Sequence, residues 1–258
     1  MSEFILIAMV AFLASLTTFF SGFGLGTILT PFFCLFFSVP DAIALTALVH
    51  LSNNLFKFSI LQKHIVFKIA IPFAVTAVVA SFTGATLLEV ISHQHYSYQY
   101  FLGGMKATVT PIKLLVAGLM ILFVIVEQFP DWSFEVKGRL SFLIGGLVSG
   151  FFGGLSGNQG ALRSMFLLKA GLKKESYLAT GVFIACMVDI SRLSIYIHNW
   201  KDLSFNNNLG LMIVAVLCAL VGSLMGKRYI QKVTLKSMQS LVVVLLTCIA
   251  VLLGFGII

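Results

Sequence analysis

The sequence predicts an all-α polytopic membrane protein made of two inverted repeats, each with five hydrophobic segments. The 258 residues are 59% hydrophobic and only 10% charged, whereas a soluble domain is typically about half apolar and about a quarter charged. Apolar stretches follow one another almost without interruption, and similar glycine-rich stretches occur in both halves of the chain. Lipid is therefore the expected solvent for most of the surface.

Ten apolar segments can be separated by their polar or glycine-rich boundaries. Their approximate ranges are 3–20, 27–39, 41–61, 65–91, 107–128, 139–154, 160–170, 174–197, 207–226 and 235–257. A helix needs about 20 residues to cross the hydrocarbon core of a bilayer. The second and seventh segments are too short for this, and the sequence allows them either to span or to dip in and return.

Basic loop residues gather on one side of the membrane when the segments are traced in order. The side that carries the N-terminus holds Lys106, Lys113 and Lys201. The other side holds Lys63, Lys68, Lys137, Arg139, Lys169, Lys173, Lys174, Lys227, Arg228, Lys232 and Lys236. Cytoplasmic loops are enriched in Lys and Arg, so both termini are expected outside a bacterial inner membrane. The net charge of +8 then belongs to membrane loops, and no nucleic-acid partner is expected.

The two halves of the chain resemble each other. FSGFGLGTILTPFFCLFF (20–37) matches GGLSGNQGALRSMFLLKA (153–170), and ALTALVHLSNNLFKFSI (44–60) matches YLATGVFIACMVDISRLSI (177–195). Each copy contains five segments, an odd number, so the second copy must enter the membrane in the opposite orientation. The expected repeats are residues 1–130 and 131–258, an arrangement typical of secondary transporters.

Glycine-rich breaks at matching places in the two repeats predict half-helices. The glycines concerned are Gly22, Gly24, Gly26, Gly153, Gly154, Gly157 and Gly160. An unwound backbone is tolerated in a membrane only where it lines a cavity or is buried in protein. Half-helices starting near Thr27 and Ala161 would present free N–H groups to an anion. The alternative is that the glycines only allow helices to pack closely.

Five ionisable residues lie deep inside apolar segments, where a charge is costly and usually functional or paired. Lys57 and Arg192 occupy equivalent places in the two repeats, so they are expected to face one anion site from opposite halves. Asp189 precedes Arg192 by one helical turn, and the alternative is that these two charges neutralise each other. Arg163 opposes the dipole of its half-helix unless an anion is bound there.

Polar residues near Lys57 extend the candidate site. Asn53 and Asn54 could donate hydrogen bonds to a substrate and His50 could carry a proton, or all three could serve only inter-helix bonding. The expected substrate-binding residues are Gly24, Gly26, Thr27, Asn53, Asn54, Lys57, Gly157, Asn158, Gln159, Arg163 and Arg192. The expected coupling or ion-pairing residues are His50 and Asp189.

Motifs for catalysis, nucleotide binding or metal binding are absent from the sequence. It contains no HExxH, GxSxG or Walker A pattern. The four cysteines form no CxxC pair and are interpreted as small buried hydrophobic residues. We therefore expect no enzymatic activity, no cofactor and no metal, and interpret His93 and His95 as part of an interfacial loop.

The glycine motifs carry a family resemblance. SGFGLGTILTPFF (21–33) and SGFFGGLSGNQGALRSMFLLKAGL (149–172), followed by ATGVFIACMVDISRL (179–193), resemble the paired motifs of the TauE/SafE sulfite exporter family. The second copy has Ser164-Met165 where proline is usual in that family, and Asn158-Gln159 within the glycine run. The resemblance implies transport of small sulfur-containing anions such as sulfite, sulfonates and sulfoacetate.

The expected function is secondary transport of such an anion by alternating access, driven by protons or the membrane potential. The residue chemistry alone implies only a small anion. Two alternatives stay open, namely an anion channel with the same cationic pore and a membrane scaffold or enzyme that hands substrate to a partner. The expected partners are the anion and the lipid bilayer, and the architecture allows a homodimer.

Overall fold

A computed structural model describes residues 2–19, 24–94, 96–128, 138–198, 205–229 and 235–258. The helices are α1 (Ser2–Thr18), α2 (Leu25–Phe33), α3 (Val39–Leu61), α4 (Phe67–Ser92), α5 (Pro111–Gln128), α6 (Arg139–Ser156), α7 (Gly160–Leu168), α8 (Lys174–His198), α9 (Phe205–Tyr229) and α10 (Leu235–Gly254). A short 3-10 helix (Gln62–His64) lies between α3 and α4. Two strands, β1 (Tyr98–Leu102) and β2 (Met105–Val109), precede α5. The described chain is therefore mostly helical, as expected.

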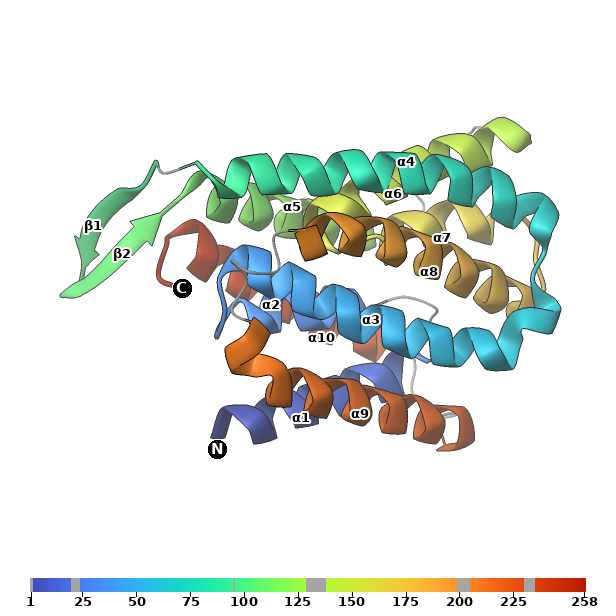
Figure 1. Ribbon diagram of the computed structural model, residues 1–258, viewed down its shortest axis with the longest axis horizontal. Coiled ribbons are helices and arrows are strands. Elements are labelled where there is room, and N and C mark those ends of the chain that lie inside the picture. Colours follow the sequence, from blue (N-terminus) through green and yellow to red (C-terminus); the bar gives the residue numbers. More distant parts are fainter. Residues whose placement is uncertain (1, 20–23, 95, 129–137, 199–204, 230–234) are drawn as a thin grey trace.

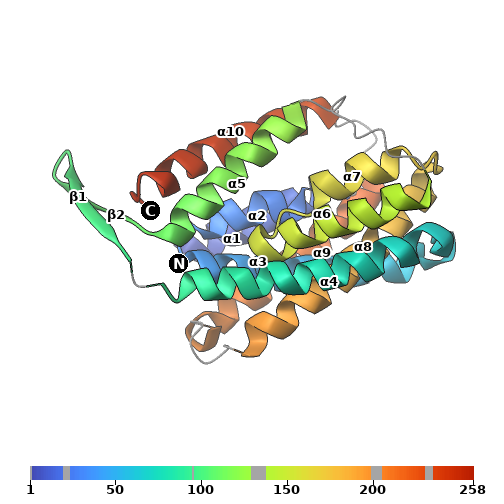
Figure 2. The ribbon, with the colours of Figure 1, turned by 90° about the horizontal axis from the view of Figure 1, so that it is seen from above.

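Helices from the two halves of the chain lie side by side. α1 packs against α9, and α4 packs against α6 and α8 (Figure 1). α3 lies against α8, and α5 lies against α10 on one flank (Figure 2). Each half therefore completes the packing of the other, and the α3–α8 contact joins the two halves in the interior.

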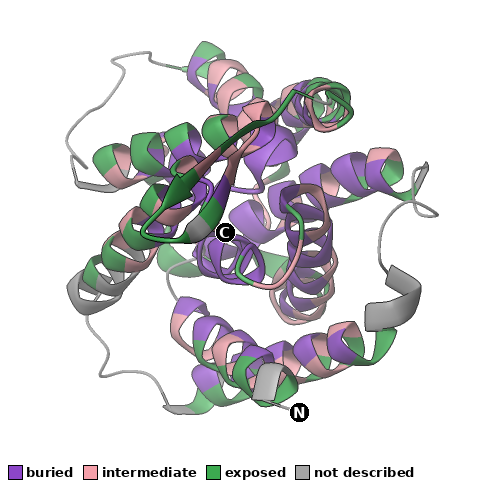
Figure 3. Ribbon diagram, turned by 90° about the vertical axis from the view of Figure 1, so that its left-hand side faces the viewer, coloured by how far each residue is buried: buried purple, intermediate pink, exposed green. Residues whose placement is uncertain are grey.

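Apolar surface covers the outside of the bundle. Four described helical stretches are long and apolar enough to span a membrane: Phe67–Ser92, Arg139–Ser156, Lys174–Ile197 and Leu209–Gly226. Shorter apolar helices cover Phe4–Thr18, Pro111–Val126 and Val243–Gly254. Figure 3 shows that exposed residues lie on the outward faces and buried residues on the inward faces. This distribution is typical of a helical membrane protein, in which large apolar side chains face lipid.

Glycines set the close contact between α4 and α6. A Cβ atom on Gly146, Gly150 or Gly154 of α6 would collide with the backbone of α4. These three glycines are spaced four residues apart and lie on one face of the helix, which lets the two backbones approach. Gly154, which the sequence suggested as part of a chain break, therefore serves close helix packing.

The non-helical breaks contain fewer residues than the glycine clusters suggested. α6 continues through Gly153 and Gly154 to Ser156, and Gly157 ends it with a φ of 81°. α7 begins at Gly160, and α2 begins at Leu25 after Gly24, with a φ of 107°. Gly22 lies outside the described residues. Both α2 and α7 have nine residues, or about 14 Å of helix, so neither can cross a bilayer alone.

A β-hairpin replaces the start of the fifth apolar segment. Residues 107–109 belong to β2, and the helix begins only at Pro111, because proline is favoured in the first turn of a helix. The hairpin turns through Gly103 and Gly104, both with positive φ. The N–H of Thr108 donates to the carbonyl of Gly256 at 2.8 Å, which attaches the hairpin to the C-terminal end of the chain. The sequence analysis treated residues 107–128 as one apolar segment, so it did not indicate the change from strand to helix.

The two ends of the bundle differ. The start of α1, the end of α10 and the hairpin lie at one end in Figure 1, while the α3–α4 connection and the start of α8 lie at the other. The latter end carries basic residues such as Lys63, Lys68 and Lys174. The arrangement matches the expected separation of basic loops, and the assignment of that end to the cytoplasm stays a prediction.

Candidate functional site

Two chain breaks from opposite halves of the sequence meet in the interior. Gly24 precedes α2 and Gly157 follows α6, and both have left-handed backbone conformations that favour glycine. A Cβ atom on Gly26 would lie 3.1 Å from the carbonyl oxygen of Gly157. Even an alanine at position 26 would therefore press on the other break. The two breaks form one structural unit around which the polar side chains gather.

Asp189 of α8 is the centre of a buried hydrogen-bond network. Its Oδ1 accepts bonds from Nε (3.0 Å) and Nη2 (2.7 Å) of Arg192, and from Nε2 of Gln159 (3.1 Å). Its Oδ2 lies 2.6 Å from Nδ1 of His50 on α3. Both Asp189 and Arg192 are fully buried, so each requires the other's charge. The carboxylate therefore links α3, α8 and the residue that precedes α7.

The C-terminal end of α6 is bound by two side chains from α8. Nη1 of Arg192 donates to the carbonyl of Gly153 at 3.4 Å, and the hydroxyl of Tyr196 donates to the carbonyl of Gly154. The last carbonyls of a helix lack intrahelical donors and carry partial negative charge. Arg192 thus serves both Asp189 and the end of α6, which favours the interpretation that it is at least in part structural.

The two adjacent asparagines of α3 have different surroundings. Nδ2 of Asn54 lies 3.1 Å from Nδ1 of His50, within the Asp189 network. Oδ1 of Asn53 instead accepts bonds from the hydroxyls of Ser15 on α1 and Ser223 on α9. Asn53 therefore joins three helices away from Asp189, whereas Asn54 borders the candidate site.

Two further cations are buried beside this network. Lys57 of α3 is 5% exposed and Arg163 of α7 is 2% exposed. Nη1 of Arg163 donates to Oε1 of Gln159 at 3.4 Å, and Nζ of Lys57 lies 5.3 Å from the ring centre of Phe19. The Arg163–Gln159–Asp189 contacts connect Arg163 to the central network.

The charges of the buried, described residues do not cancel. Lys57, Arg163 and Arg192 are basic, and Asp189 is the single carboxylate among the buried residues described. Basic side chains therefore outnumber carboxylates by two, with His50 not counted. Such an excess is unfavourable in a low-dielectric interior unless an anion offsets it.

The remaining predicted residues lie in or next to the breaks. Thr27 is buried in the first turn of α2, and Asn158 and Gln159 form the link between Gly157 and α7. All thirteen residues expected at the site lie within the described part of the chain. The structure brings most of them to the meeting point of the breaks, with Asn53 set apart.

Comparison with known protein families identifies the chain. A model of the family described as Sulfite exporter TauE/SafE matches residues 7–253, nearly the whole chain. The chain belongs to the TauE/SafE family. It is accordingly a multi-pass membrane protein of a transporter family. Comparisons with curated proteins and with solved structures found no match for it.

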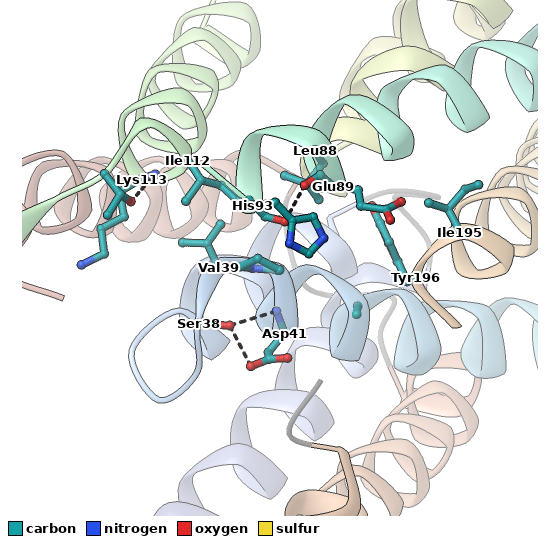
Figure 4. Close-up of a pocket in the computed structure, with 14 residues that line it drawn as sticks. Ser38, Val39, Asp41, Leu88, Glu89, His93, Ile112, Lys113, Ile195 and Tyr196 are labelled. Carbon is teal, nitrogen blue, oxygen red and sulfur yellow. Dashed lines mark hydrogen bonds between the residues drawn. The ribbon is translucent and has the colours of Figure 1, made fainter. Parts of the chain in front are cut away.

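This TauE/SafE member has a pocket at its hairpin end that the sequence did not suggest. The pocket has a volume of about 410 Å³ and lies between α3, α4, α5 and α8 (Figure 4). Its wall includes Asp41, Glu89, His93, Lys113 and Tyr196. These residues come from four helix ends that are far apart in the sequence, so no local pattern signals them.

Tyr196 belongs both to the pocket and to the surroundings of the Asp189 network. It lines the pocket, and it lies one helical turn after Arg192 on the same face of α8. Its hydroxyl is bonded to Gly154 at the end of α6. α3 continues from the pocket residues Asp41 and Ala44 toward His50, so both central helices lead from the pocket to the buried site.

Metal binding has no support in the described residues. No group of three or more His, Cys, Asp and Glu side chains lies together among them. The four cysteines form no disulfide, and Cys34 and Cys186 are buried as expected. Cys248 is exposed on the apolar exterior, because a small apolar thiol is acceptable on a face that contacts lipid.

Proposed function

We propose that this TauE/SafE member is a secondary transporter that moves a small sulfur-containing anion of the sulfite, sulfonate or sulfoacetate class across the cytoplasmic membrane. The observation that carries the proposal is that buried basic side chains outnumber buried carboxylates by two among the described residues around the two breaks. A bound anion would offset this excess in a region where water cannot. Membership of the family suggests a sulfur-containing substrate, and the buried basic residues suggest that the substrate is negatively charged.

An internal repeat would explain why Lys57 is the cation available for substrate. Asn54 and Asp189 are separated by 135 residues, and so are Lys57 and Arg192. In the second repeat Asp189 neutralises Arg192, one turn later on the helix. In the first repeat the corresponding residue is the neutral Asn54, which leaves the charge of Lys57 for the substrate to offset.

Helix packing supports an inverted repeat of residues 1–130 and 131–258. Exchanging α1–α5 with α6–α10 converts the α1–α9 contact into the α6–α4 contact. The same exchange converts α3–α9 into α8–α4, and leaves the α3–α8 and α5–α10 contacts unchanged. A pseudo-twofold axis between α3 and α8 accounts for this pattern, and inverted repeats of this kind allow alternating access.

The access route follows the central helices. The pocket at the hairpin end would be the outer approach to the site, with both termini outside, and the contact of Tyr196 with α6 would close it. His50, bonded to Asp189, is placed to couple transport to protons, since histidine titrates near neutral pH. The chain would work without a cofactor, alone or as a homodimer in the bilayer.

Uptake into proteoliposomes tests the proposal. The purified full chain would be assayed with labelled sulfite, a labelled sulfonate and labelled sulfate, beside Lys57→Gln and Arg163→Gln. A hydrogen bond to a charged group contributes about 1.5–3 kcal/mol, so each variant should weaken substrate affinity by at least about tenfold. Lys63→Gln is the matched control, because Lys63 is an exposed cation just beyond α3.

The outcomes separate transport from its alternatives. Saturable uptake that both buried-cation variants lose, and that Lys63→Gln keeps, would support an anion carrier. Uptake that rises linearly with anion concentration and is not coupled to a proton gradient would favour a channel. Absence of uptake for all three anions would contradict the proposed function.

A further inference from the structure

Three buried polar side chains at the breaks have no hydrogen-bond partner among the described residues. They are Thr30 and Thr46, both 0% exposed, and Asn158, 3% exposed. The hydroxyl oxygen of each threonine and both amide atoms of Asn158 are unpaired in this way. Buried polar groups are nearly always paired in folded proteins. A group of three in one region therefore calls for a physical cause.

The residues that carry these unpaired groups lie at or next to the contact between the two breaks. Oγ1 of Thr30 lies 3.1 Å, and Nη1 of Arg192 3.0 Å, from the point that a Cβ atom on Gly157 would occupy. Asn158 is the next residue along the chain. A hydroxyl and a guanidinium nitrogen thus approach a glycine that has no side chain of its own.

Thr46 approaches the same contact from α3. Its Cγ2 and Cδ2 of His50 each lie 3.8 Å from the point that a Cβ atom on Gly26 would occupy. Gly26 in turn abuts the carbonyl of Gly157. Thr46 also lies one helical turn before His50, on the face of α3 that borders the Asp189 network.

Thr30 and Thr46 differ from six other helical threonines of this chain. A buried helical threonine usually satisfies its hydroxyl by donating to a carbonyl three or four residues earlier. The threonines that do so here are Thr17, Thr18, Thr76, Thr83, Thr86 and Thr247. Thr30 and Thr46 keep their hydroxyls out of such bonds although the same type of acceptor is near.

We propose that Thr30, Thr46 and Asn158 bind the substrate anion directly, as neutral hydrogen-bond donors that complete the cationic site. This inference rests on the proposed function and adds its selectivity. Hydroxyl and amide groups can donate to the oxygens of an anion, which offer only acceptors. The oxygens of the Asp189 carboxylate are already bonded to Arg192, Gln159 and His50.

The neutral donors would give the site its preference for an oxyanion. Lys57 and Arg163 attract any anion, because a point charge in a low dielectric does not distinguish shapes. Donors fixed on α2, on α3 and in the link before α7 point in set directions and match oxygens that spread around a central sulfur atom. A spherical halide gains less from such an arrangement. Loss of a hydroxyl should therefore weaken sulfite binding more than chloride binding.

Binding to the purified full chain tests the inference. Labelled sulfite, with unlabelled chloride as competitor, would be measured for wild type, Thr30→Val, Thr46→Val and Asn158→Leu. Valine keeps the shape of threonine and removes the hydroxyl. Thr30→Ser restores that hydroxyl, and Thr86→Val is the matched control, since Thr86 is exposed and bonded to its own helix.

The expected results separate binding from structure. Each of the three variants should raise the Kd for sulfite about tenfold, while Thr30→Ser and Thr86→Val stay within about twofold of wild type. The chloride competition constant should hardly change. The Tm of both valine variants should stay or rise, because an unpaired buried hydroxyl is removed.

Two results would overturn the inference. Unchanged sulfite affinity in the variants would remove these side chains from the site while leaving the proposed function intact. A lower Tm in Thr30→Val that Thr30→Ser does not share, with an unaltered sulfite-to-chloride ratio, would make the hydroxyl structural. Asn158→Leu remains informative if a valine variant fails to fold, since it lies outside the helices. A wild-type chain that binds neither sulfite nor sulfonate nor sulfate would reject the proposed function itself.

Discussion

Nδ1 of His50 lies 2.6 Å from Oδ2 of Asp189, so one hydrogen bond joins α3 in the first half of the chain to α8 in the second. The other oxygen of the same carboxylate binds Arg192 and Gln159. The two central helices and the break before α7 therefore share one negative charge. A change in that charge is expected to affect both halves of the molecule.

Asp189→Asn should destabilise the protein severely. Arg192 would keep its charge while fully buried, and removal of one partner of a buried ion pair costs about 3–5 kcal/mol. The double variant Asp189→Asn/Arg192→Gln removes both charges and should recover much of the loss. Thermal unfolding of the four proteins in the same detergent measures the coupling. A double variant less stable than Asp189→Asn would show that the pair is not the cause.

Asn54→Asp should abolish anion uptake without unfolding the chain. It places a carboxylate one turn before Lys57, as Asp189 stands before Arg192. The new carboxylate would then neutralise the charge of Lys57, and the affinity for sulfite should fall at least about tenfold. Asn54→Leu, which also loses the contact with His50 but adds no charge, should keep most of the uptake. Equal losses in both variants would contradict the charge explanation.

His50→Gln should uncouple uptake from protons. Glutamine can still donate a hydrogen bond toward Asp189 but cannot take up a proton near neutral pH. Sulfite uptake by wild type should respond to an imposed pH gradient, and uptake by the variant should not. The measurement is initial uptake into vesicles with and without the gradient. A variant that responds like wild type would exclude His50 as the coupling group.

Tyr196→Phe should loosen the closure between the pocket and the buried site. The hydrogen bond to the carbonyl of Gly154 would be lost at a cost of about 1 kcal/mol, or roughly fivefold in the population of open molecules. A cysteine introduced by Ala47→Cys, which is fully buried about one helical turn beyond the pocket residue Ala44 on α3, should react that much faster with a membrane-impermeant thiol reagent. An unchanged rate would show that the contact does not control access.

Gly150→Ala should destabilise the α4–α6 contact. Its new methyl group would collide with the backbone of Ala77, and overpacking of this kind costs about 1–3 kcal/mol. Gly118→Ala is the matched control, because nothing lies within 4 Å of the added methyl group and alanine favours helix more than glycine. Thermal unfolding should lower the midpoint for Gly150→Ala only. Equal midpoints would mean that α4 can move aside.

The sequence was most informative about charged residues in apolar segments, where burying a charge is energetically unfavourable. Lys57, Arg163, Asp189 and Arg192 stood out because charges in apolar segments need a reason. The paired breaks were also visible, although their glycines looked alike. Gly157 adopts a left-handed conformation, whereas Gly154 packs against α4. A glycine in the sequence carries no sign of which of these roles it has.

The sequence by itself determined that the chain is a helical membrane protein with charges and glycine breaks at matching places, because hydrophobicity, charge and repeat spacing are local properties. Only the tertiary structure decided that Asp189 binds Arg192 and His50 together, that Asn53 bonds to α1 and α9, and that four helix ends form the pocket. These contacts join residues that are far apart in the chain. They depend on how the helices pack, including the contact of α3 with α8, which no local pattern specifies.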